Sequence, residues 1–109
     1  MAIVIALCGV SAHAQSKPPA LVDTAALAPE YRTAAATVAK FLSEKGEKPR
    51  EFFAEITRSP DGKELVFHLW HESAFDAKYR NVRGNPGGKN RDVHYNLRSG
   101  TVTGMLFWQ

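Results

Sequence analysis

Residues 51–72 read EFFAEITRSPDGKELVFHLWHE, and this stretch decides the fold because it encodes two strands and the turn between them. Apolar and polar residues alternate in the first strand, predicted over 51–57, and the second strand, predicted over 64–72, is apolar on both faces. The segment Ser59-Pro60-Asp61-Gly62 is typical of a turn, since proline fixes φ and glycine lets the chain reverse. The stretch therefore predicts an antiparallel hairpin.

A second hairpin lies further along the chain, with strands predicted over 91–97 and 101–109. Upstream of both hairpins, residues 29–45 carry apolar side chains at spacings of three and four, and Pro29 and Gly46 are typical of a helix start and a helix stop. These elements predict an α+β fold, in which one amphipathic helix packs on a four-stranded antiparallel meander sheet.

Three parts follow one another along the chain. Residues 1–14 (MAIVIALCGVSAHA) are almost without polarity and end in Ala12-His13-Ala14, which predicts a signal peptide cleaved before Gln15. The alternative is a buried apolar strand, since the stretch lacks the usual positive charge at its start. Residues 15–26 predict a flexible leader, and 27–109 a single domain. Export to the periplasm or the medium would exclude many nucleotide-dependent enzymes, because those compartments hold no ATP pool.

The composition of the chain excludes further classes of partner and of active site. Fourteen Lys and Arg against eleven Asp and Glu give a formal net charge of +3, which is too slight to indicate a nucleic-acid partner. The single cysteine, Cys8, lies in the predicted signal peptide, so the mature domain is expected to have neither a disulfide nor a cysteine nucleophile. No membrane span is predicted for the mature chain. The sequence has no G-x-S-x-G elbow and no phosphate-binding loop, and it implies no cofactor.

Alternation along the strands splits the predicted sheet into two faces. The helix is expected to cover the apolar set Leu65, Phe67, Leu69, Val93, Tyr95, Leu97, Val102, Leu106 and Trp108. The other face is expected to carry His68, Trp70, Glu72, Asp92, His94, Asn96, Met105 and Phe107. That face is aromatic and polar at once, which indicates a partner surface. The alternative is that its aromatic side chains pack against the leader or the connection 74–90.

The connection between the hairpins is strongly basic. Residues 78–91 (KYRNVRGNPGGKNR) contain five Lys and Arg and no acidic residue. A flexible basic loop beside an aromatic face suits an anionic partner, which could be an acidic protein surface, a cell-wall polymer, lipid A phosphates or nucleic acid. A protein partner, either a toxin or an envelope component with an acidic surface, is expected, and the alternative is a loop that keeps the protein soluble. The predicted partner-binding residues are Trp70, His68, Glu72, His94, Phe107, Arg80, Arg83, Lys89 and Arg91.

An enzyme is the alternative function. His68, Glu72 and His94 carry the imidazole and carboxylate groups of a metal-assisted or acid–base site. No known ligand spacing supports such a site, so these histidines are expected to form hydrogen bonds at a half-buried surface, and no metal is predicted.

The helix 29–45, the pair Gly87-Gly88 before a strand, and the closing hairpin 92–102 (DVHYNLRSGTV) together resemble small exported bacterial domains of the cystatin-like kind. The nearest resemblance is to the nuclear transport factor 2-like immunity proteins, and the next is to PepSY-type domains. It covers residues 27–109, although this chain has one helix where the larger cone-shaped domains have several. The resemblance implies a non-enzymatic exported binder, such as one that neutralises a toxin in the periplasm, and no catalytic residue carries over.

Overall fold

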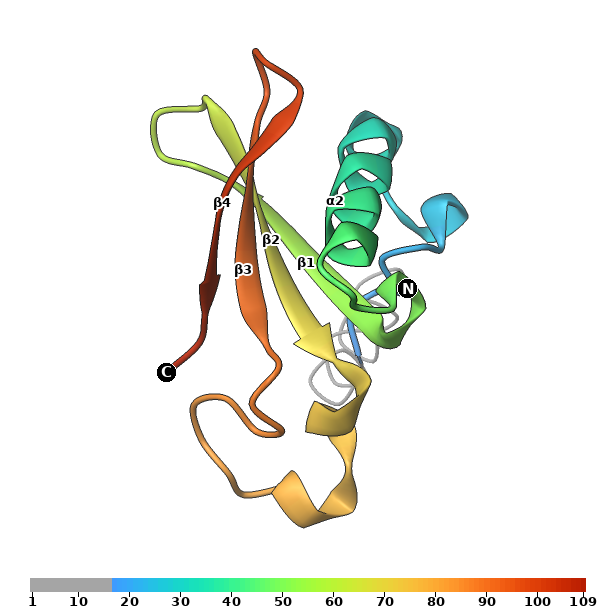
Figure 1. Cartoon of the computed structure of the whole chain (residues 1–109), viewed down its shortest axis with the longest axis vertical. Helices are drawn as coiled ribbons and strands as arrows, with labels where there is room; N and C mark the ends of the chain where they lie inside the picture. Colours follow the sequence, from blue (N-terminus) through green and yellow to red (C-terminus); the bar gives the residue numbers. More distant parts are fainter. Residues whose placement is uncertain (1–16) are drawn as a thin grey trace, which may run out of the picture.

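The computed structural model describes residues 17–109, so the predicted signal peptide lies outside the described residues. It is an α+β fold in which the helix α2 (Arg32–Glu44) packs on one face of a four-stranded antiparallel sheet (Figure 1). The strands lie in the order β1-β2-β3-β4, with bounds β1 (Phe52–Arg58), β2 (Glu64–His71), β3 (Arg91–Asn96) and β4 (Thr101–Phe107). The predicted helix and antiparallel meander are thus confirmed. Among the described residues, no helix has the length and apolar character needed to cross a bilayer.

The residues that flank α2 determine where this helix begins and ends. A short 3-10 turn, Pro29–Tyr31, leads into α2, with proline in the first turn, where its missing N–H costs nothing. At the other end Gly46 takes a φ of +84°, and the N–H of Glu47 donates to the carbonyl of Leu42 across 3.0 Å. This bond is the signature of a Schellman motif, which needs a residue in the left-handed region and so favours glycine.

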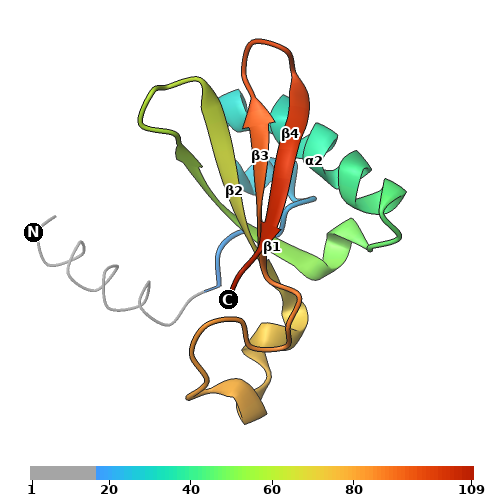
Figure 2. The same cartoon turned by 60° about the vertical axis from the view of Figure 1, so that its left-hand side comes forward.

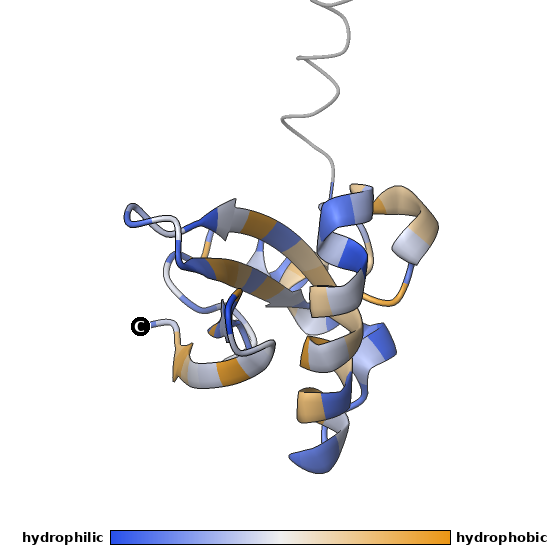
Figure 3. Ribbon diagram, turned by 90° about the horizontal axis from the view of Figure 1, so that it is seen from above, coloured by the Kyte–Doolittle hydropathy of each residue, from blue (hydrophilic) through white to orange (hydrophobic). Residues whose placement is uncertain are grey.

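The core lies between α2 and the sheet. The helix buries Ala34, Ala35, Val38 and Leu42. The sheet contributes alternate residues of its strands, among them Phe52, Ala54, Leu65, Phe67, Leu69, Val93 and Tyr95. Figure 3 shows the corresponding alternation of hydrophobic and hydrophilic bands along the strands. The face predicted for β2 and the first part of β3 is therefore correct.

The face predicted for β4 is correct for Val102, which packs against the core, but it is wrong beyond Thr103, and a β-bulge is the reason. His94 pairs with Gly104 but Tyr95 pairs with Val102, which leaves Thr103 as an extra residue on β4. A bulge shifts the alternation by one residue, so every side chain beyond it changes face. Met105 and Phe107 therefore lie on the helix side, whereas Leu106 and Trp108 lie on the opposite face. Leu97 was also expected under the helix, yet it lies beyond the end of β3 and is 37% exposed.

The segment predicted as a flexible leader is partly built into the fold. The N–H of Leu21 donates to the carbonyl of Phe52, and the N–H of Ala54 donates to the carbonyl of Pro19, so residues 19–21 pair with the start of β1. Leu21 is buried in the core. The leader prediction is therefore wrong for these residues, because their pairing partner lies some thirty residues further along the chain.

The long connection between β2 and β3 extends beyond one end of the sheet, as Figures 1 and 2 show. It contains two short 3-10 turns, Glu72–Phe75 and Ala77–Tyr79. Glu72 thus begins the connection and does not belong to β2. We call residues 78–90 the basic loop.

Candidate functional site

The sheet face opposite α2, called the open face here, carries a chain of hydrogen bonds across its strands. The carboxylate of Asp92 on β3 accepts from Nδ1 of His68 on β2 across 2.9 Å. Nε2 of the same ring forms a hydrogen bond with the hydroxyl of Thr57 on β1, again at 2.9 Å. The same Asp92 oxygen also accepts from Nε1 of Trp108, at 2.8 Å. Both ring nitrogens of His68 are therefore engaged within the protein.

A second row of polar contacts runs parallel to the first. The carboxylate of Glu64 receives a hydrogen bond from the hydroxyl of Thr103 at 2.8 Å and one from Nδ1 of His94 at 3.1 Å. These two donors, Thr103 foremost, hold the pKa of Glu64 below its ordinary value. Each open-face histidine thus has a carboxylate partner of its own.

This geometry does not assemble the metal-assisted or acid–base site of the alternative enzyme hypothesis. His68 and His94 share the open face, but Glu72 begins the connection after β2. Within residues 17–109 no group of three or more His, Cys, Asp and Glu side chains is placed to hold a metal ion. Thr57, His68 and Asp92 do place a hydroxyl, an imidazole and a carboxylate in the order found around an activated nucleophile. However, none of the three residues lines either of the cavities described below.

An aromatic cluster occupies the end of the open face nearest the basic loop. It consists of Phe53, Trp70, Phe75 and Trp108. The rings of Trp70 and Trp108 meet edge to face, with centroids 4.7 Å apart, and Phe53 and Phe75 meet likewise at 5.5 Å. Such edge-to-face pairs are favourable because the positive ring edge meets the negative ring face. The indole Nε1 of Trp70 is buried and has no hydrogen-bond partner among the described residues.

Two cavities flank the aromatic cluster, and Trp70 and Phe75 line both of them. One, of about 630 Å³, lies between the leader and β1, and its lining includes Pro18, Leu27, Tyr31 and Ile56. The other, of about 420 Å³, lies between the cluster and the connection, and its lining includes Tyr79, Arg80, Val82 and Pro86. The structure therefore places Trp70 between two concave surfaces.

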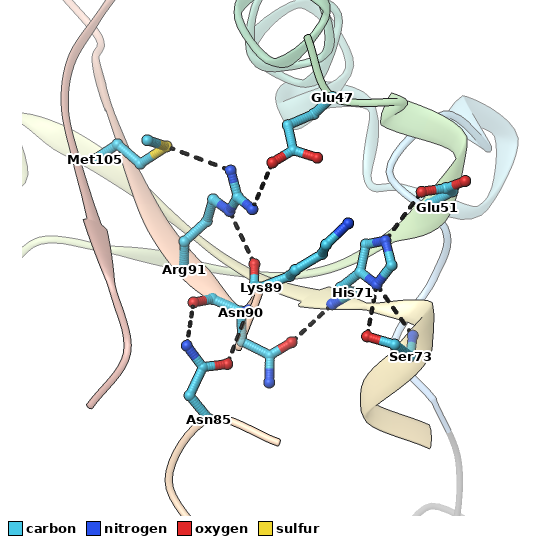
Figure 4. A network of polar contacts seen from close by, with 9 residues as sticks. All are labelled: Glu47, Glu51, His71, Ser73, Asn85, Lys89, Asn90, Arg91 and Met105. Atoms are coloured by element: carbon cyan, nitrogen blue, oxygen red, sulfur yellow. Dashed lines mark hydrogen bonds and ion pairs between the residues drawn. The ribbon is translucent and has the colours of Figure 1, made fainter. Parts of the chain in front are cut away.

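The basic residues predicted to bind a partner fall into two groups. Arg80, Arg83 and Lys89 are exposed on the basic loop. Arg91, in contrast, is 1% exposed, so its assignment to a partner surface is wrong. Its guanidinium lies against the rings of Phe52 and Phe107, 5.0 Å and 4.3 Å from their centroids. It bonds to Glu47 at 2.9 Å and to the carbonyl of Lys89 at 2.9 Å (Figure 4). A desolvated charge requires such partners.

A buried histidine beside Arg91 anchors the connection to the sheet. Nε2 of His71 donates to Glu51 across 2.9 Å, and Nδ1 accepts from the backbone N–H of Ser73 at 3.1 Å and faces its hydroxyl at 2.8 Å (Figure 4). The N–H of His71 donates to the side chain of buried Asn90 at 2.8 Å. The sequence indicated this burial in one way, since His71 lies on the same side of β2 as Leu69 when side chains alternate along the strand. The sequence did not indicate the hydrogen-bond partners of His71.

The end of the basic loop is fixed by side-chain bonds and by a close backbone approach. Asn85 exchanges hydrogen bonds with the backbone of Asn90 and also donates to the carbonyl of Trp108. Gly87 has a φ of +82°, and a Cβ at this position would lie 2.5 Å from the hydroxyl oxygen of Ser73. Glycine is thus required here both for the backbone conformation and for space.

The predicted partner-binding residues therefore do not form one patch. Trp70 lies at the aromatic cluster, His68 and His94 lie on the open face, and Glu72 is exposed at the start of the connection. Phe107 is 47% exposed on the helix side of β4. Comparison with protein-family models, curated proteins and solved structures finds no match for this chain.

Proposed function

We propose that the protein is an exported, non-catalytic binding module that contacts a protein partner through Trp70 and the basic loop beside it. The observation that carries this proposal is that Trp70 and Arg80 line the same cavity, between the aromatic cluster and the connection. Tryptophan and arginine dominate the energetic centres of protein interfaces, because each combines a large contact area with directional polar groups.

The charge of the loop supports an acidic partner. Arg80, Arg83 and Lys89 are exposed, and residues 77–90 contain no Asp or Glu. An unbalanced basic surface attracts an acidic one and raises the rate of encounter. The resemblance to immunity proteins suggests a toxin with an acidic surface, met in the periplasm or outside the cell, as the partner.

The hydrogen bonds of the open face favour binding over metal-assisted or acid–base catalysis. A zinc ligand needs a free ring nitrogen, and both nitrogens of His68 are bonded to protein groups. Glu72 lies in a different element from the two histidines that the enzyme hypothesis needs. The histidines thus serve the sheet as cross-strand contacts.

Crosslinking in the periplasm, followed by mass spectrometry, tests the proposal. The double variant Arg80→Ser with Arg83→Ser removes two exposed charges from the loop, and Lys40→Ser with Lys48→Ser removes two exposed charges from the α2 region as the matched control. We expect the loop variant to lose the main crosslinked protein and the control to keep it. With that protein purified, the affinity of the wild type should fall as salt rises, because exposed charges are screened over about 8–10 Å.

The variant Trp70→Ala gives a second readout, since loss of binding with an unchanged far-ultraviolet spectrum would place the indole in the interface. Equal binding by the loop variant and the control would contradict the proposal. So would stoichiometric zinc in the purified protein that His68→Ala removes together with a catalytic activity.

A further inference from the structure

The two edges of the sheet differ in how they are protected. On the β1 side, residues 19–21 already pair with Phe52 and Ala54, and Pro18 and Pro19 have no N–H with which to extend this ladder. Glu55 and Arg58 add exposed charges along the same strand. Proline, charge and a covering segment are the usual devices that keep an edge from pairing with another chain.

The β4 edge has almost none of these devices. Residues Thr101–Phe107 read TVTGMLF and include no charged side chain. Leu106 is 69% exposed and Phe107 is 47% exposed, which makes them two neighbouring members of the small set of exposed large apolar residues in the described chain. Within residues 17–109, no backbone hydrogen bond joins the outer edge of β4 to another segment. An uncharged apolar edge of this kind favours pairing with another strand.

The ladder of β3 and β4 fixes which backbone groups face outward. Leu106 pairs with Asp92 and Gly104 with His94, and the N–H of Trp108 donates to the carbonyl of Asn90. Because hydrogen bonding alternates along an antiparallel strand, the N–H and C=O groups of Met105 and Phe107 point away from β3. The bulge lies at Thr103, so the strand is regular from Gly104 onward.

We propose that β4 pairs in antiparallel orientation with β4 of a second copy of this chain, about a twofold axis at Leu106. In this register Met105 of each copy exchanges both backbone hydrogen bonds with Phe107 of the other, and the two Leu106 side chains meet on the open face. Gly104 then lies opposite Trp108 of the other copy. A side chain at Gly104 would meet no atom within 4 Å, so the indole has room.

The lack of charge on β4 identifies the occupant as a second copy. A twofold interface is self-complementary, so a charged residue near its axis would meet an identical charge. On β1, a twofold axis at Glu55 or at Arg58 would place two like charges opposite each other, whereas β4 carries no charge and pairs apolar residues with apolar residues throughout its regular part. The exposed apolar area of Leu106 and Phe107 is buried by the same contact, which supplies the driving force.

Sedimentation equilibrium of the purified mature protein tests this pairing, and reductant is added if the chain retains Cys8, so that no disulfide joins two chains. We expect the wild type to dimerise reversibly with a dissociation constant on the order of 1 to 100 μM, because a single pair of edge strands forms a small interface. Leu106→Lys should weaken dimerisation by at least about tenfold, because two lysines would then meet at the axis. Val22→Lys is the matched control, since Val22 is 48% exposed and lies outside the sheet.

A charge-swap experiment tests the register itself. Leu106→Lys and Leu106→Glu should each dimerise at least about tenfold more weakly than the wild type when alone, and they should form a heterodimer when mixed. A wild type that stays monomeric at about 100 μM, or a Leu106→Lys variant that dimerises as well as Val22→Lys, would overturn the proposal. So would a mixture of the two Leu106 variants that does not associate. Circular dichroism of each variant checks that the fold is kept, and the Arg80 and Arg83 variants should dimerise normally, which separates this inference from the proposed function.

Discussion

Nη2 of Arg91 donates a hydrogen bond to the carboxylate of Glu47 across 2.9 Å, and this ion pair joins β3 to the segment that follows α2. The arginine is buried, whereas the Glu47 side chain is 24% exposed. The guanidinium therefore depends on a partner at the rim of the core for much of its compensation. Removing that partner would leave a buried charge with the Lys89 carbonyl, the Met105 sulfur and two aromatic rings.

Glu47→Gln is accordingly expected to lower the free energy of unfolding by about 1–3 kcal/mol, the usual cost of an unpaired buried charge with some remaining contacts. Urea denaturation measures this change. Glu44→Gln, at an exposed position in the last turn of α2, should change stability by no more than about 0.5 kcal/mol. Equal effects of the two variants would show that the ion pair contributes nothing.

The contact between Glu51 and His71 should make stability depend on pH. The hydrogen bond from His71 is the main cause that lowers the pKa of Glu51 in the folded protein. In acid the unfolded chain therefore binds more protons than the folded one, so stability rises with pH through this range and is lost as pH falls below about 4.3, the ordinary value for Glu. Glu51→Gln should flatten this slope between about pH 3 and pH 5, as followed by urea midpoints. Glu55→Gln, at an exposed position, should keep the wild-type slope.

Two leucines of the sheet, on strands that β3 separates, should lose very different amounts of stability on truncation. Leu69 on β2 is fully buried, so Leu69→Ala should cost about 2–5 kcal/mol of stability through lost packing and the cavity left behind. Leu106→Ala should cost no more than about 0.5 kcal/mol, because Leu106 is 69% exposed. Thermal unfolding at a protein concentration too low for association measures both. A large loss of stability from Leu106→Ala alone would show that this side chain packs under the helix after all.

The neighbouring glycines of the basic loop provide a matched pair. Gly87 and Gly88 both have a positive φ, so alanine at either position is strained by about 1–2 kcal/mol. A Cβ at Gly88 would meet nothing within 4 Å, whereas one at Gly87 would collide with the Ser73 hydroxyl. Gly87→Ala should therefore be clearly more destabilising than Gly88→Ala in urea unfolding. Similar losses would mean that the loop moves away from Ser73 at little cost.

Export can be checked directly on the mature protein. The apolar residues 1–14 and the triplet before Gln15 predict cleavage at that point, so mass spectrometry should find Gln15 at the N-terminus, either free or cyclised. Protein that retains Met1 and is recovered from the cytoplasmic fraction would contradict the predicted signal peptide.

Much of the fold could be predicted from the sequence because its determinants are local. The turn at Ser59–Gly62 forms as expected, with the N–H of Gly62 donating to the carbonyl of Ser59 and the carboxylate of Asp61 accepting from the N–H of Lys63. The stop of α2 at Gly46 and the alternation in β2 are likewise properties of a few adjacent residues. The sequence also indicated that a basic loop and Trp70 lie near each other, since they are close in the chain.

The face of β4, the burial of Arg91 and the docking of Leu21 were decided only by the tertiary structure. Each depends on a partner elsewhere in the sequence. The face of β4 depends on how that strand pairs with β3 around the bulge at Thr103. The burial of Arg91 depends on its ion pair with Glu47, and the docking of Leu21 depends on its hydrogen bond to Phe52. A one-residue bulge leaves no mark in the pattern of β4 itself, yet it reverses every side chain beyond it. For the same reason the sequence could assign side chains to faces only as far as the register stayed regular, and the register is a property of two strands together.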